Sequence, residues 1–568
     1  MRKNNIIVYT GKKDRESQKS IYRQSSGDSS AVGDLPAKKE KGTPRKRRQE
    51  KLKKEKPIRA GAPASAGAPT APSASPGKRP ARPRRTYKAL IAVAVCAAIV
   101  IGSAGGYWGV KAAERKQQAL TDSIVPTDVE ASIDLQFVPK VPAILPRLDF
   151  AALATNETNA TLKSMHEYFG GRPATFTNEY TGMFKGYNFI QIIAEAFSPW
   201  ILALEPQLYP NLNRLYHEGF QFTNFYTPYY YQSTSDGEYV TLQSQIPVTG
   251  HWYTGHNSMI MSAKNYLPQT MAHQLANEGY SIITAYHNWN YSFYRRNESH
   301  PNLGYKWVAM GSGLSIPYSW PTSDVDLMKA SIPEYINSGE PFHIYYLTMS
   351  GHQNYNWGGN NMCARHRSEV ADLPYAEVVK AYLACNIELD LAVGYLLDEL
   401  EKAGIADRTL ISLTPDHYPY GLDNDGAGGM SLLAGRKLDT VFEYYESGWL
   451  LWSGSMTEPI VVDTLACCMD TLPTLNNLLG VKWDSRLLMG QDVFSDAERL
   501  VIFGSHSWMT ELGRYNASAR KFTPNEGAVI PDGYAEKITA AVERAFVMSR
   551  QILTNNYFKV IYTKSNLI

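Results

Sequence analysis

The sequence places acidic or imidazole side chains directly after several runs of apolar residues. Glu195 follows NFIQIIA, His287 ends SIITAYH, His352 follows FHIYYLTMSG, and Asp416 and His417 follow TLISLTP. Each of these residues alone is explained by an ordinary loop or surface position, but four strand-like runs with such ends are hard to assign to chance. Oxygen and imidazole ligands of this kind suit a divalent cation such as Mn²⁺, Mg²⁺ or Zn²⁺.

A hydroxyl group that could act on such a cation lies in the stretch YYYQSTSDGE. Ser235 and Glu238 have the S-x-x-E spacing of a capping box, which predicts a helix through residues 239–243 with Thr234 just ahead of its N-terminus. Free backbone N–H groups and the helix dipole favour an anion there. A threonine hydroxyl on a divalent cation can lose its proton and attack phosphorus. An ordinary helix cap and a flexible surface loop are the alternative interpretations.

The elements that would position these residues alternate along the chain from Asn188. The predicted strands are NFIQIIA, FQFTNFYT, SIITAYH, FHIYYL and TLISLTP, and helical runs such as PNLNRLYHEGF, TMAHQLANEGY, residues 376–404 and DTLPTLNNLLGV lie between or after them. This alternation predicts an α/β domain with a mostly parallel sheet sandwiched by helices. Open sheets of this type bind ligands at the carboxyl ends of their strands, where the acidic and imidazole residues lie.

The N-terminal part of the chain has a different composition. Residues 1–88 hold 25 of the 57 Lys and Arg but 7 of the 54 Asp and Glu, with few large apolar residues, so we expect residues 1–87 to form a disordered basic tail. Beside a membrane, such a tail more often contacts anionic lipid than nucleic acid, and no nucleic-acid partner is expected.

A transmembrane helix is predicted at residues 88–110. Ala89–Val110 holds 22 uncharged residues, enough to cross a bilayer, and the basic residues before it keep the N-terminus in the cytoplasm. The alternative, a cleaved signal peptide, would need an unusually long leader. We therefore expect a single-pass cell-membrane protein in which residues 111–184 form an extracellular connector, with a helix through TLKSMHEYF, and residues 185–568 form the catalytic domain.

The cysteines outside this segment would lie in an oxidising compartment. Cys363 and Cys385 could form a disulfide or remain as two thiols, and both alternatives are open. Cys467 and Cys468 are interpreted as buried thiols, and none of the four has the spacing of a zinc site.

The ordered motifs NFIQIIAEAF, STSDGE, AYHNWNYSFYRRN, TMSGH and TPDHY resemble the extracellular catalytic domain of lipoteichoic acid synthases, a branch of the alkaline phosphatase/sulfatase superfamily. The similarity covers roughly residues 185–500. It implies one divalent cation, with Mn²⁺ favoured over Mg²⁺ or Zn²⁺, and a nucleophile that attacks the phosphate of a lipid such as phosphatidylglycerol. By this resemblance the catalytic nucleophile is Thr234, the metal ligands are Glu195, Thr234, Asp416 and His417, and the headgroup-binding residues are His287, Arg296 and His352.

The resemblance also implies the partners, a membrane phospholipid as donor and a cell-envelope glycolipid or polymer as acceptor. The chain departs from the family pattern, because Tyr294 replaces a Trp, Trp289 replaces an Asp, and one predicted anchor replaces about five membrane helices. Sulfatase chemistry is not expected, since no C/S-x-P-x-R motif is present. A phosphoethanolamine transferase, a phosphodiesterase, and a catalytically idle envelope-binding module that uses aromatic residues such as Trp357 are the alternative functions.

Overall fold

The computed structural model of the protein describes residues 140–248, 257–424 and 428–568. The chain divides into two units, residues 1–131 and 132–568, and all described residues belong to the second. The predicted basic tail, the predicted membrane helix and residues 111–139 of the predicted connector lie outside the described residues. Among the described helices, none combines the length and the apolar character that crossing a bilayer requires.

The largest sheet within the described residues has nine strands in the order β11-β2-β10-β8-β1-β7-β4-β5-β6. Its strands are β1 (Asn188–Ala194), β2 (Phe220–Phe222), β4 (Ile282–Asn290), β5 (Lys306–Met310), β6 (Gly313–Leu314), β7 (Phe342–Leu347), β8 (Thr409–Pro415), β10 (Leu450–Ser453) and β11 (Ile460–Val462). Every neighbouring pair is parallel except the two that β10 makes with β2 and β8. The predicted mostly parallel α/β sheet is confirmed.

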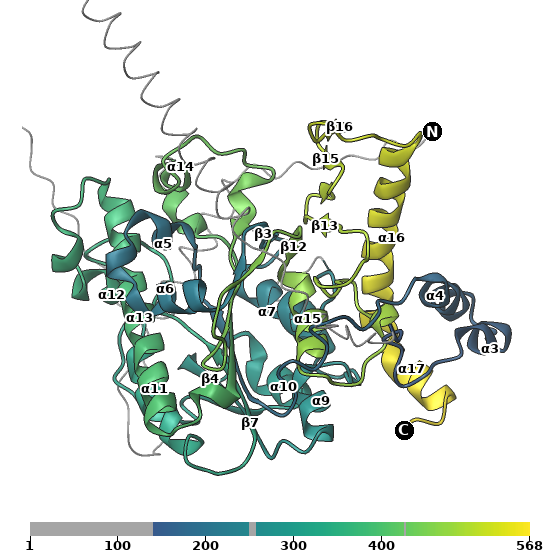
Figure 1. The fold of residues 1–568 in the computed structure, drawn as a ribbon, viewed down its shortest axis with the longest axis horizontal. Helices are drawn as coiled ribbons and strands as arrows, with labels where there is room; N and C mark the ends of the chain where they lie inside the picture. The colour runs from purple at the N-terminus through teal and green to yellow at the C-terminus, as the bar shows by residue number, and fades with distance from the viewer. Residues whose placement is uncertain (1–139, 249–256, 425–427) are drawn as a thin grey trace, which may run out of the picture. The chain divides into compact units, whose positions relative to one another are not determined.

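Helices cover both faces of this sheet (Figure 1). One face carries α5 (Trp200–Leu204), α6 (Pro210–Glu218), α11 (Asp324–Ser331), α12 (Asn361–Arg365), α13 (Glu377–Lys402) and α14 (Gly429–Leu433). The other carries α7 (Ser233–Gln243), α8 (Ser258–Ser262), α9 (Met271–Asn277), α10 (Arg296–Asn302) and α15 (Thr471–Leu478). Alternate β1 residues serve the two faces, because Ile190 and Ile192 join one core while Phe189 and Ile193 join those on the other side.

The register of the central strands brings the candidate residues to one edge of the sheet. Ala194 of β1 pairs with Pro415 of β8, so the next residues of the two strands, Glu195 and Asp416, leave the sheet side by side. On the other side of β1, Ile193 pairs with Leu347 of β7, which in turn pairs with His287 of β4.

The stretch FQFTNFYT was predicted as one strand but forms two, so this part of the prediction is wrong. Its first half is β2 in the large sheet, and its second half is β3 (Phe225–Tyr226) in a small sheet with β9 (Glu446–Ser447) and β12 (Ala466–Cys467). The chain changes sheets because all four Phe and Tyr side chains of the two pieces are buried, and no single strand can present them all to one core.

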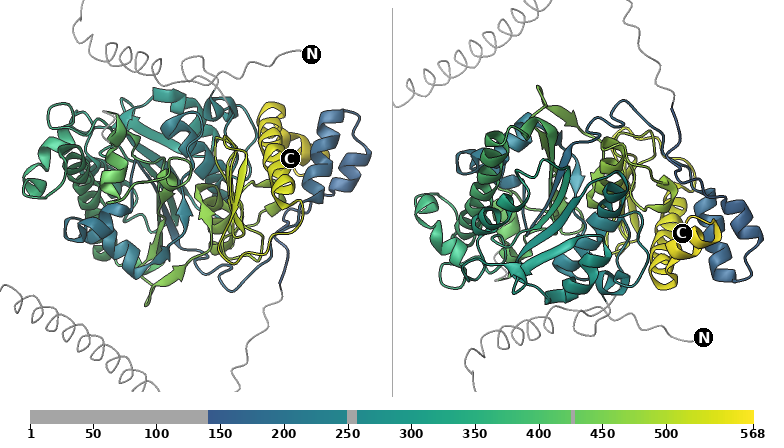
Figure 2. Two further views of the ribbon diagram at one scale, coloured as in Figure 1. Left: turned by 90° about the horizontal axis from the view of Figure 1, so that it is seen from above. Right: turned by 90° about the horizontal axis from the view of Figure 1, so that it is seen from below.

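Segments from both ends of the described chain lie side by side at one end of the domain (Figure 2). Helices α3 (Phe150–Thr155) and α4 (Ala160–Gly171) adjoin α16 (Tyr534–Asn555) and α17 (Tyr557–Lys564), and Phe169 lies 5.2 Å from Tyr557 between ring centroids. The helix predicted through TLKSMHEYF is therefore present as α4. A four-stranded sheet of β13 (Val501–Ile502), β14 (Trp508–Thr510), β15 (Gly513–Asn516) and β16 (Lys521–Pro524) lies beside α16.

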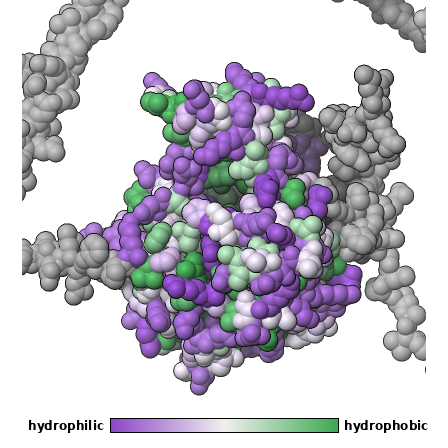
Figure 3. All heavy atoms as spheres, turned by 90° about the vertical axis from the view of Figure 1, so that its right-hand side faces the viewer, coloured by the Kyte–Doolittle hydropathy of each residue, from purple (hydrophilic) through white to green (hydrophobic). Residues whose placement is uncertain are grey.

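The face that carries α3, α4 and α16 is hollowed, and hydrophobic side chains lie inside the hollow (Figure 3). A cavity of about 770 Å³ is lined by residues of α16, the end of α4 and the chain around Met489, including Arg172, Ile502 and Ile538. None of the residues predicted to bind metal or headgroup lines this cavity.

All four cysteines of the described residues are buried free thiols, which confirms the prediction for Cys467 and Cys468. Cys363 of α12 and Cys385 of α13 adopt the second of their two predicted alternatives.

Candidate active site

Helix α7 places the predicted nucleophile in its first turn. The predicted capping box is wrong, because the helix begins at Ser233 rather than after Ser235, and its cap residue Gln232 makes no side-chain capping bond. The acid of the first turn is Asp236, which accepts hydrogen bonds from the backbone N–H groups of Tyr231 and Gln232. Thr234 is therefore a helical residue, 9% exposed, and its hydroxyl donates to Glu195 Oε2 at 3.2 Å.

Two glycines let backbone segments approach the candidate residues closely. A Cβ on Gly237 of α7 would lie 2.1 Å from the carbonyl oxygen of Asp416, and one on Gly351 would lie 2.2 Å from that of Glu195. Because neither carbonyl is on a flexible side chain, a larger residue would push α7 or the loop after β7 away. These glycines of STSDGE and TMSGH thus set the distance between Thr234 and the ends of β1 and β8.

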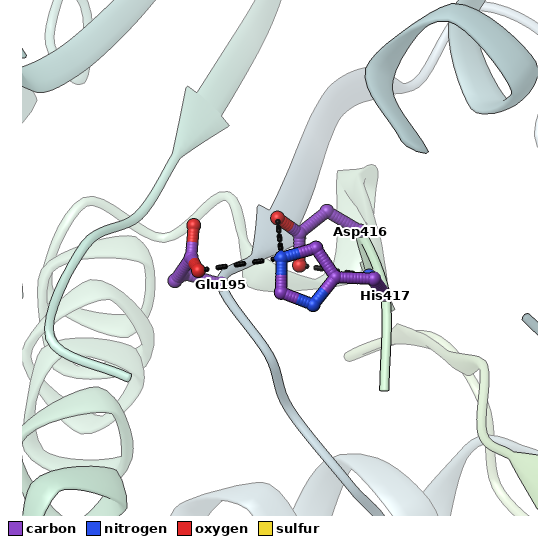
Figure 4. A group of neighbouring side chains, drawn as sticks. All are labelled: Glu195, Asp416 and His417. Atoms are coloured by element: carbon purple, nitrogen blue, oxygen red, sulfur yellow. Dashed lines mark hydrogen bonds and ion pairs between the residues drawn. The ribbon is translucent and has the colours of Figure 1, made fainter. Parts of the chain in front are cut away.

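Glu195, Asp416 and His417 converge at the carboxyl ends of β1 and β8 (Figure 4). Nε2 of His417 lies 3.5 Å from Glu195 Oε1 and 3.2 Å from Asp416 Oδ2. One potential ligand atom from each residue lies within 4.8 Å of the others, and all three residues are buried. The structure therefore brings together the four residues predicted as metal ligands, including Thr234 through its bond to Glu195.

Hydrogen bonds orient this cluster and leave specific atoms available. Oδ1 of Asp416 accepts from the backbone N–H groups of Ala196 and His417, both at 2.8 Å. Nδ1 of His417 must carry its proton, since it donates to the carbonyl of Tyr418 at 2.9 Å. The remaining atoms, Asp416 Oδ2 and His417 Nε2, are buried and have no hydrogen-bond partner. Buried polar atoms normally have partners, so this donor set fits a divalent cation.

The charges of the cluster also suit a divalent cation. Burial and the negative charge of Glu195 raise the pKa of Asp416 to about 7. Burial opposes a charge on His417, but the neighbouring carboxylates raise the pKa of its imidazole to about 9. Burial opposes the Glu195 charge too, yet His352, His417 and the Thr234 hydroxyl lower its pKa to about 2. Two close carboxylates with one imidazole retain a proton, which a bound cation would displace.

The predicted headgroup residues do not share one environment. His287 is buried, and its Nδ1–H donates to the carbonyl of Leu347 at 2.9 Å. Burial and the charge of Arg296 lower the His287 pKa to about 3, so this imidazole is neutral. His352 is half-buried and lies edge-on to Trp320, and it is close enough to Glu195 to help lower the pKa of that carboxyl group.

Arg296 differs most from its prediction. It was predicted to bind the headgroup, but it lies in an ion pair, as does its neighbour Arg295. Arg295 pairs with Glu298 on the surface, while Arg296 is 2% exposed and pairs with Glu238 at 2.7 Å. The charge of Arg296 is thus compensated within the protein, and its role in headgroup binding stays a prediction.

Several aromatic residues near the cluster were not predicted as site residues. The ring of Tyr420 lies 4.7 Å from that of His417, and Tyr229 contacts His417, Tyr418 and Tyr420. Tyr294 contacts Arg296, with the guanidinium carbon 5.2 Å from the ring centroid. The sequence signal for Tyr229, Tyr418 and Tyr420 was the density of tyrosines in YYYQST and DHYPY.

Asp324, at the start of α11, is a second residue that sequence reasoning missed. Its buried carboxylate accepts hydrogen bonds from Asn288, from the N–H of Met349 and from Ser350. It thereby joins the residue after His287 to the loop that leads to His352. No local signal marked it, because the partners lie far away in sequence.

Comparison with known proteins finds relatives of this chain. The chain is 24% identical over 344 residues to lipoteichoic acid synthase 2 of Bacillus subtilis, covering 57% of this chain and 50% of that protein. It is 22% identical over 395 residues to lipoteichoic acid synthase of Staphylococcus aureus, covering 67% of this chain and 59% of that protein. The chain thus spans between half and three fifths of the length of these relatives.

A solved structure has a similar fold. The crystal structure of the lipoteichoic acid synthase LtaP from Listeria monocytogenes superimposes with a TM-score of 0.57 at 19% identity, covering 69% of this chain and 98% of that one. The sulfatase family itself matches residues 187–481, which include the nucleophile helix and the whole acidic cluster. Because this match covers more than half of the chain, the protein belongs to the sulfatase family.

Proposed function

We propose that the protein is a membrane-anchored, metal-dependent phosphotransferase that moves a phosphoglycerol group from a phospholipid such as phosphatidylglycerol to a cell-envelope acceptor. The observation that carries the proposal is the position of the Thr234 hydroxyl, which is hydrogen-bonded to Glu195 beside buried atoms of Asp416 and His417 that have no hydrogen-bond partner. A hydroxyl in this setting is of use to a phosphotransferase and of no use to a binding module.

The metal site of the proposal consists of Glu195, Thr234, Asp416 and His417. A divalent cation bound there, for which we favour Mn²⁺, would stabilise negative charge on a phosphoryl oxygen and lower the pKa of the threonine hydroxyl. The chain's own contribution is orientation. Nδ1 of His417 and Oδ1 of Asp416 are fixed by backbone partners, so that the other atom of each faces Glu195.

The reaction has two transfers at Thr234. In the first, its oxygen bonds to the lipid phosphorus while the bond from phosphorus to the diacylglycerol oxygen breaks, and that oxygen takes up a proton. In the second, a hydroxyl of the acceptor bonds to phosphorus, the bond to Thr234 breaks, and the threonine recovers a proton. We assign the proton transfers to His352, whose imidazole is half-buried and acts on Glu195.

The donor headgroup would bind among His287, Arg296 and His352. His287 is neutral with its Nδ1–H taken by Leu347, so its Nε2 can accept a hydrogen bond from a hydroxyl of a glycerol headgroup. The names of the relatives, lipoteichoic acid synthases, support a phosphoglycerol donor and a glycolipid or polymer acceptor. The proposal keeps the extracellular catalytic domain and the membrane anchor at residues 88–110 as the sequence predicts them.

Transfer of phosphoethanolamine is a second candidate, and one observation favours it. The charge of Arg296 is compensated by Glu238, so the pocket repels an ammonium group less than a free arginine would. The two candidates differ in the donor and share the nucleophile.

The test is release of diacylglycerol from vesicles that contain labelled phosphatidylglycerol or labelled phosphatidylethanolamine, with and without Mn²⁺. We expect release from phosphatidylglycerol by the wild type, a loss of about a thousandfold or more in Thr234→Ala, and partial activity in Thr234→Ser. Mass spectrometry of the wild type should detect the phosphoglycerol group on Thr234.

Release from phosphatidylethanolamine alone would favour the second candidate. No release from either lipid by a protein that binds Mn²⁺ would contradict both candidates and favour an envelope-binding module.

A further inference from the structure

Glu238 is a fully buried acid on α7, one helical turn after Thr234. All its side-chain hydrogen bonds go to other elements. Oε2 accepts from Arg296 Nε at 2.9 Å and Nη2 at 2.7 Å, and Oε1 accepts from His300 Nε2 at 3.0 Å and the Tyr345 hydroxyl at 2.9 Å. One carboxylate thus joins the nucleophile helix to α10 and to the central strand β7.

Both members of the Glu238–Arg296 pair are charged. Burial alone would neutralise Glu238, but the charge of Arg296 and the hydrogen bond from His300 lower its pKa to about 2. Burial lowers the pKa of His300 and keeps it neutral, so its single Nε2–H donates to Glu238. The pair therefore has net charge zero, and each carboxylate oxygen has two donors.

The backbone just before Arg296 is strained, and its conformation directs Arg296 toward Glu238. Tyr294 and Arg295 are consecutive non-glycine residues in the left-handed region, both at φ 54°. Such conformations persist where the surroundings hold them, and they concentrate at functional sites. Here the turn sends Arg295 outward to Glu298 and Arg296 inward to Glu238.

Glu238 does not engage the whole guanidinium. It takes Nε and Nη2, so Nη1 is the nitrogen of Arg296 that remains outside this pair. Arg296 lies close enough to His287 to lower its pKa, and it lies against the ring of Tyr294. It therefore belongs to the predicted headgroup pocket even though its charge is compensated.

We propose that Glu238 is a positioning residue for ligand binding, which fixes Arg296 relative to Thr234 so that Nη1 alone donates to one phosphoryl oxygen. This inference rests on the proposed function. A single hydrogen bond from Nη1 takes the place of the bidentate contact that an arginine without Glu238 would make with a phosphate. Since Glu238 and Thr234 share one rigid helix, the carboxylate sets the distance from the guanidinium to the hydroxyl.

The test compares Glu238→Gln, Arg296→Lys, the double variant and Tyr345→Phe in the full-length protein. Tyr345→Phe is the matched control, because it removes a hydrogen bond from the same carboxylate and leaves the arginine contacts intact. Calorimetry measures the binding of Mn²⁺ alone and then of glycerol phosphate to the Mn²⁺-loaded protein, and donor turnover gives KM and kcat.

We expect Glu238→Gln to weaken glycerol phosphate binding and raise the donor KM by about tenfold, with Mn²⁺ affinity changed by less than about twofold. Tyr345→Phe should change glycerol phosphate binding by less than about threefold. In the Arg296→Lys background, Glu238→Gln should have little further effect on binding, since it acts through the arginine. Glu238→Asp should restore part of the affinity.

Three results would overturn the inference. The first is a Glu238→Gln protein that melts at a lower temperature yet binds glycerol phosphate like the wild type, which would make the carboxylate only structural. The second is full additivity with Arg296→Lys. The third is a wild type that binds no glycerol phosphate. If the wild type binds it and Glu238→Gln weakens binding while no lipid is turned over, the positioning role stands and the proposed function fails.

Discussion

Two buried acidic clusters lie against the same helix, α7, and differ in how their charges are compensated. Around Glu195, Asp416 and His417, two carboxylates and one imidazole face one another, and two of the buried atoms have no hydrogen-bond partner. Around Glu238, both oxygens have two donors each, and a guanidinium balances the charge. The first cluster offers ligand atoms to a divalent cation, and the second is already balanced by a guanidinium.

The difference teaches that burial of acids alone does not identify a metal site. Both clusters contain a fully buried Glu with a pKa lowered to about 2. What separates them is the number of donors, since a satisfied carboxylate has no lone pair left for a ligand. Each of the following changes tests one side of this comparison.

The largest effect is expected from Asp416→Asn. Its Oδ1 can still accept from Ala196 and His417, but a negative charge beside Glu195 is lost. We expect Mn²⁺ affinity to fall about a hundredfold or more, while the metal-free protein becomes more stable by about 1–2 kcal/mol because like charges no longer repel. Calorimetry measures the first effect, and thermal unfolding in chelator measures the second.

The contrasting change is Glu238→Gln, which should destabilise the metal-free protein by about 3 kcal/mol, since it leaves Arg296 buried and unpaired. If both variants shifted stability in the same direction, the distinction between the clusters would be lost.

A smaller effect is expected from Asp324→Asn. Asp324 holds the ends of β4 and β7 without any cation, and an amide would keep one oxygen as acceptor but turn its NH₂ group toward either Asn288 or Ser350, both of which are donors. The donor KM should rise about fivefold, with kcat and Mn²⁺ affinity less affected, and stability should fall by about 1–3 kcal/mol. Asp326→Asn removes an acid from the same helical turn without these contacts and is the control. An unchanged KM would restrict Asp324 to a structural role.

The smallest effect is expected at a partly solvated pair, Glu157 with Lys564 of α17. The hydrogen bonds from Lys564 and the backbone of Asn159 lower the Glu157 pKa from 4.5 to about 2. Because the folded pKa lies below the ordinary one, the pair stabilises the protein above about pH 4.5, and this stabilisation is lost as the pH falls toward 2.

Glu157→Gln should therefore lower the melting temperature by roughly 1–2 °C at pH 7, since the Lys564 side chain is 42% exposed and solvent screens the pair. The difference from the wild type should shrink below pH 4.5. Melting curves across this range check the sign, and a difference that grows on acidification would contradict it.

The central fold was predictable because buried parallel strands leave continuous apolar runs in the sequence. NFIQIIA, FHIYYL and TLISLTP were found in this way, and the residues that follow them meet because parallel strands end at one edge. The antiparallel strand β10 and the short strands β5 and β11 were missed, since their few residues carry no distinctive periodicity.

The sequence indicated which residues could form the candidate site, but not which side chains each of them contacts. The S-x-x-E spacing of Ser235 and Glu238 is the same whether Glu238 caps the helix or points toward β7, so the sequence could not exclude the second arrangement. In the same way, RRN contains two arginines, and only the backbone conformation at Tyr294 and Arg295 sends one inward.

The sequence alone placed Glu195, Asp416 and His417 at one edge of the sheet, because apolar runs reveal where parallel strands end. The resemblance to lipoteichoic acid synthases added Thr234 as the fourth ligand. Only the tertiary structure decided which buried charges are compensated. That outcome depends on contacts between residues far apart in the chain, such as Glu238 with Arg296. Packing sets the hydrogen-bond distances, and these decide whether a buried carboxylate has all its partners.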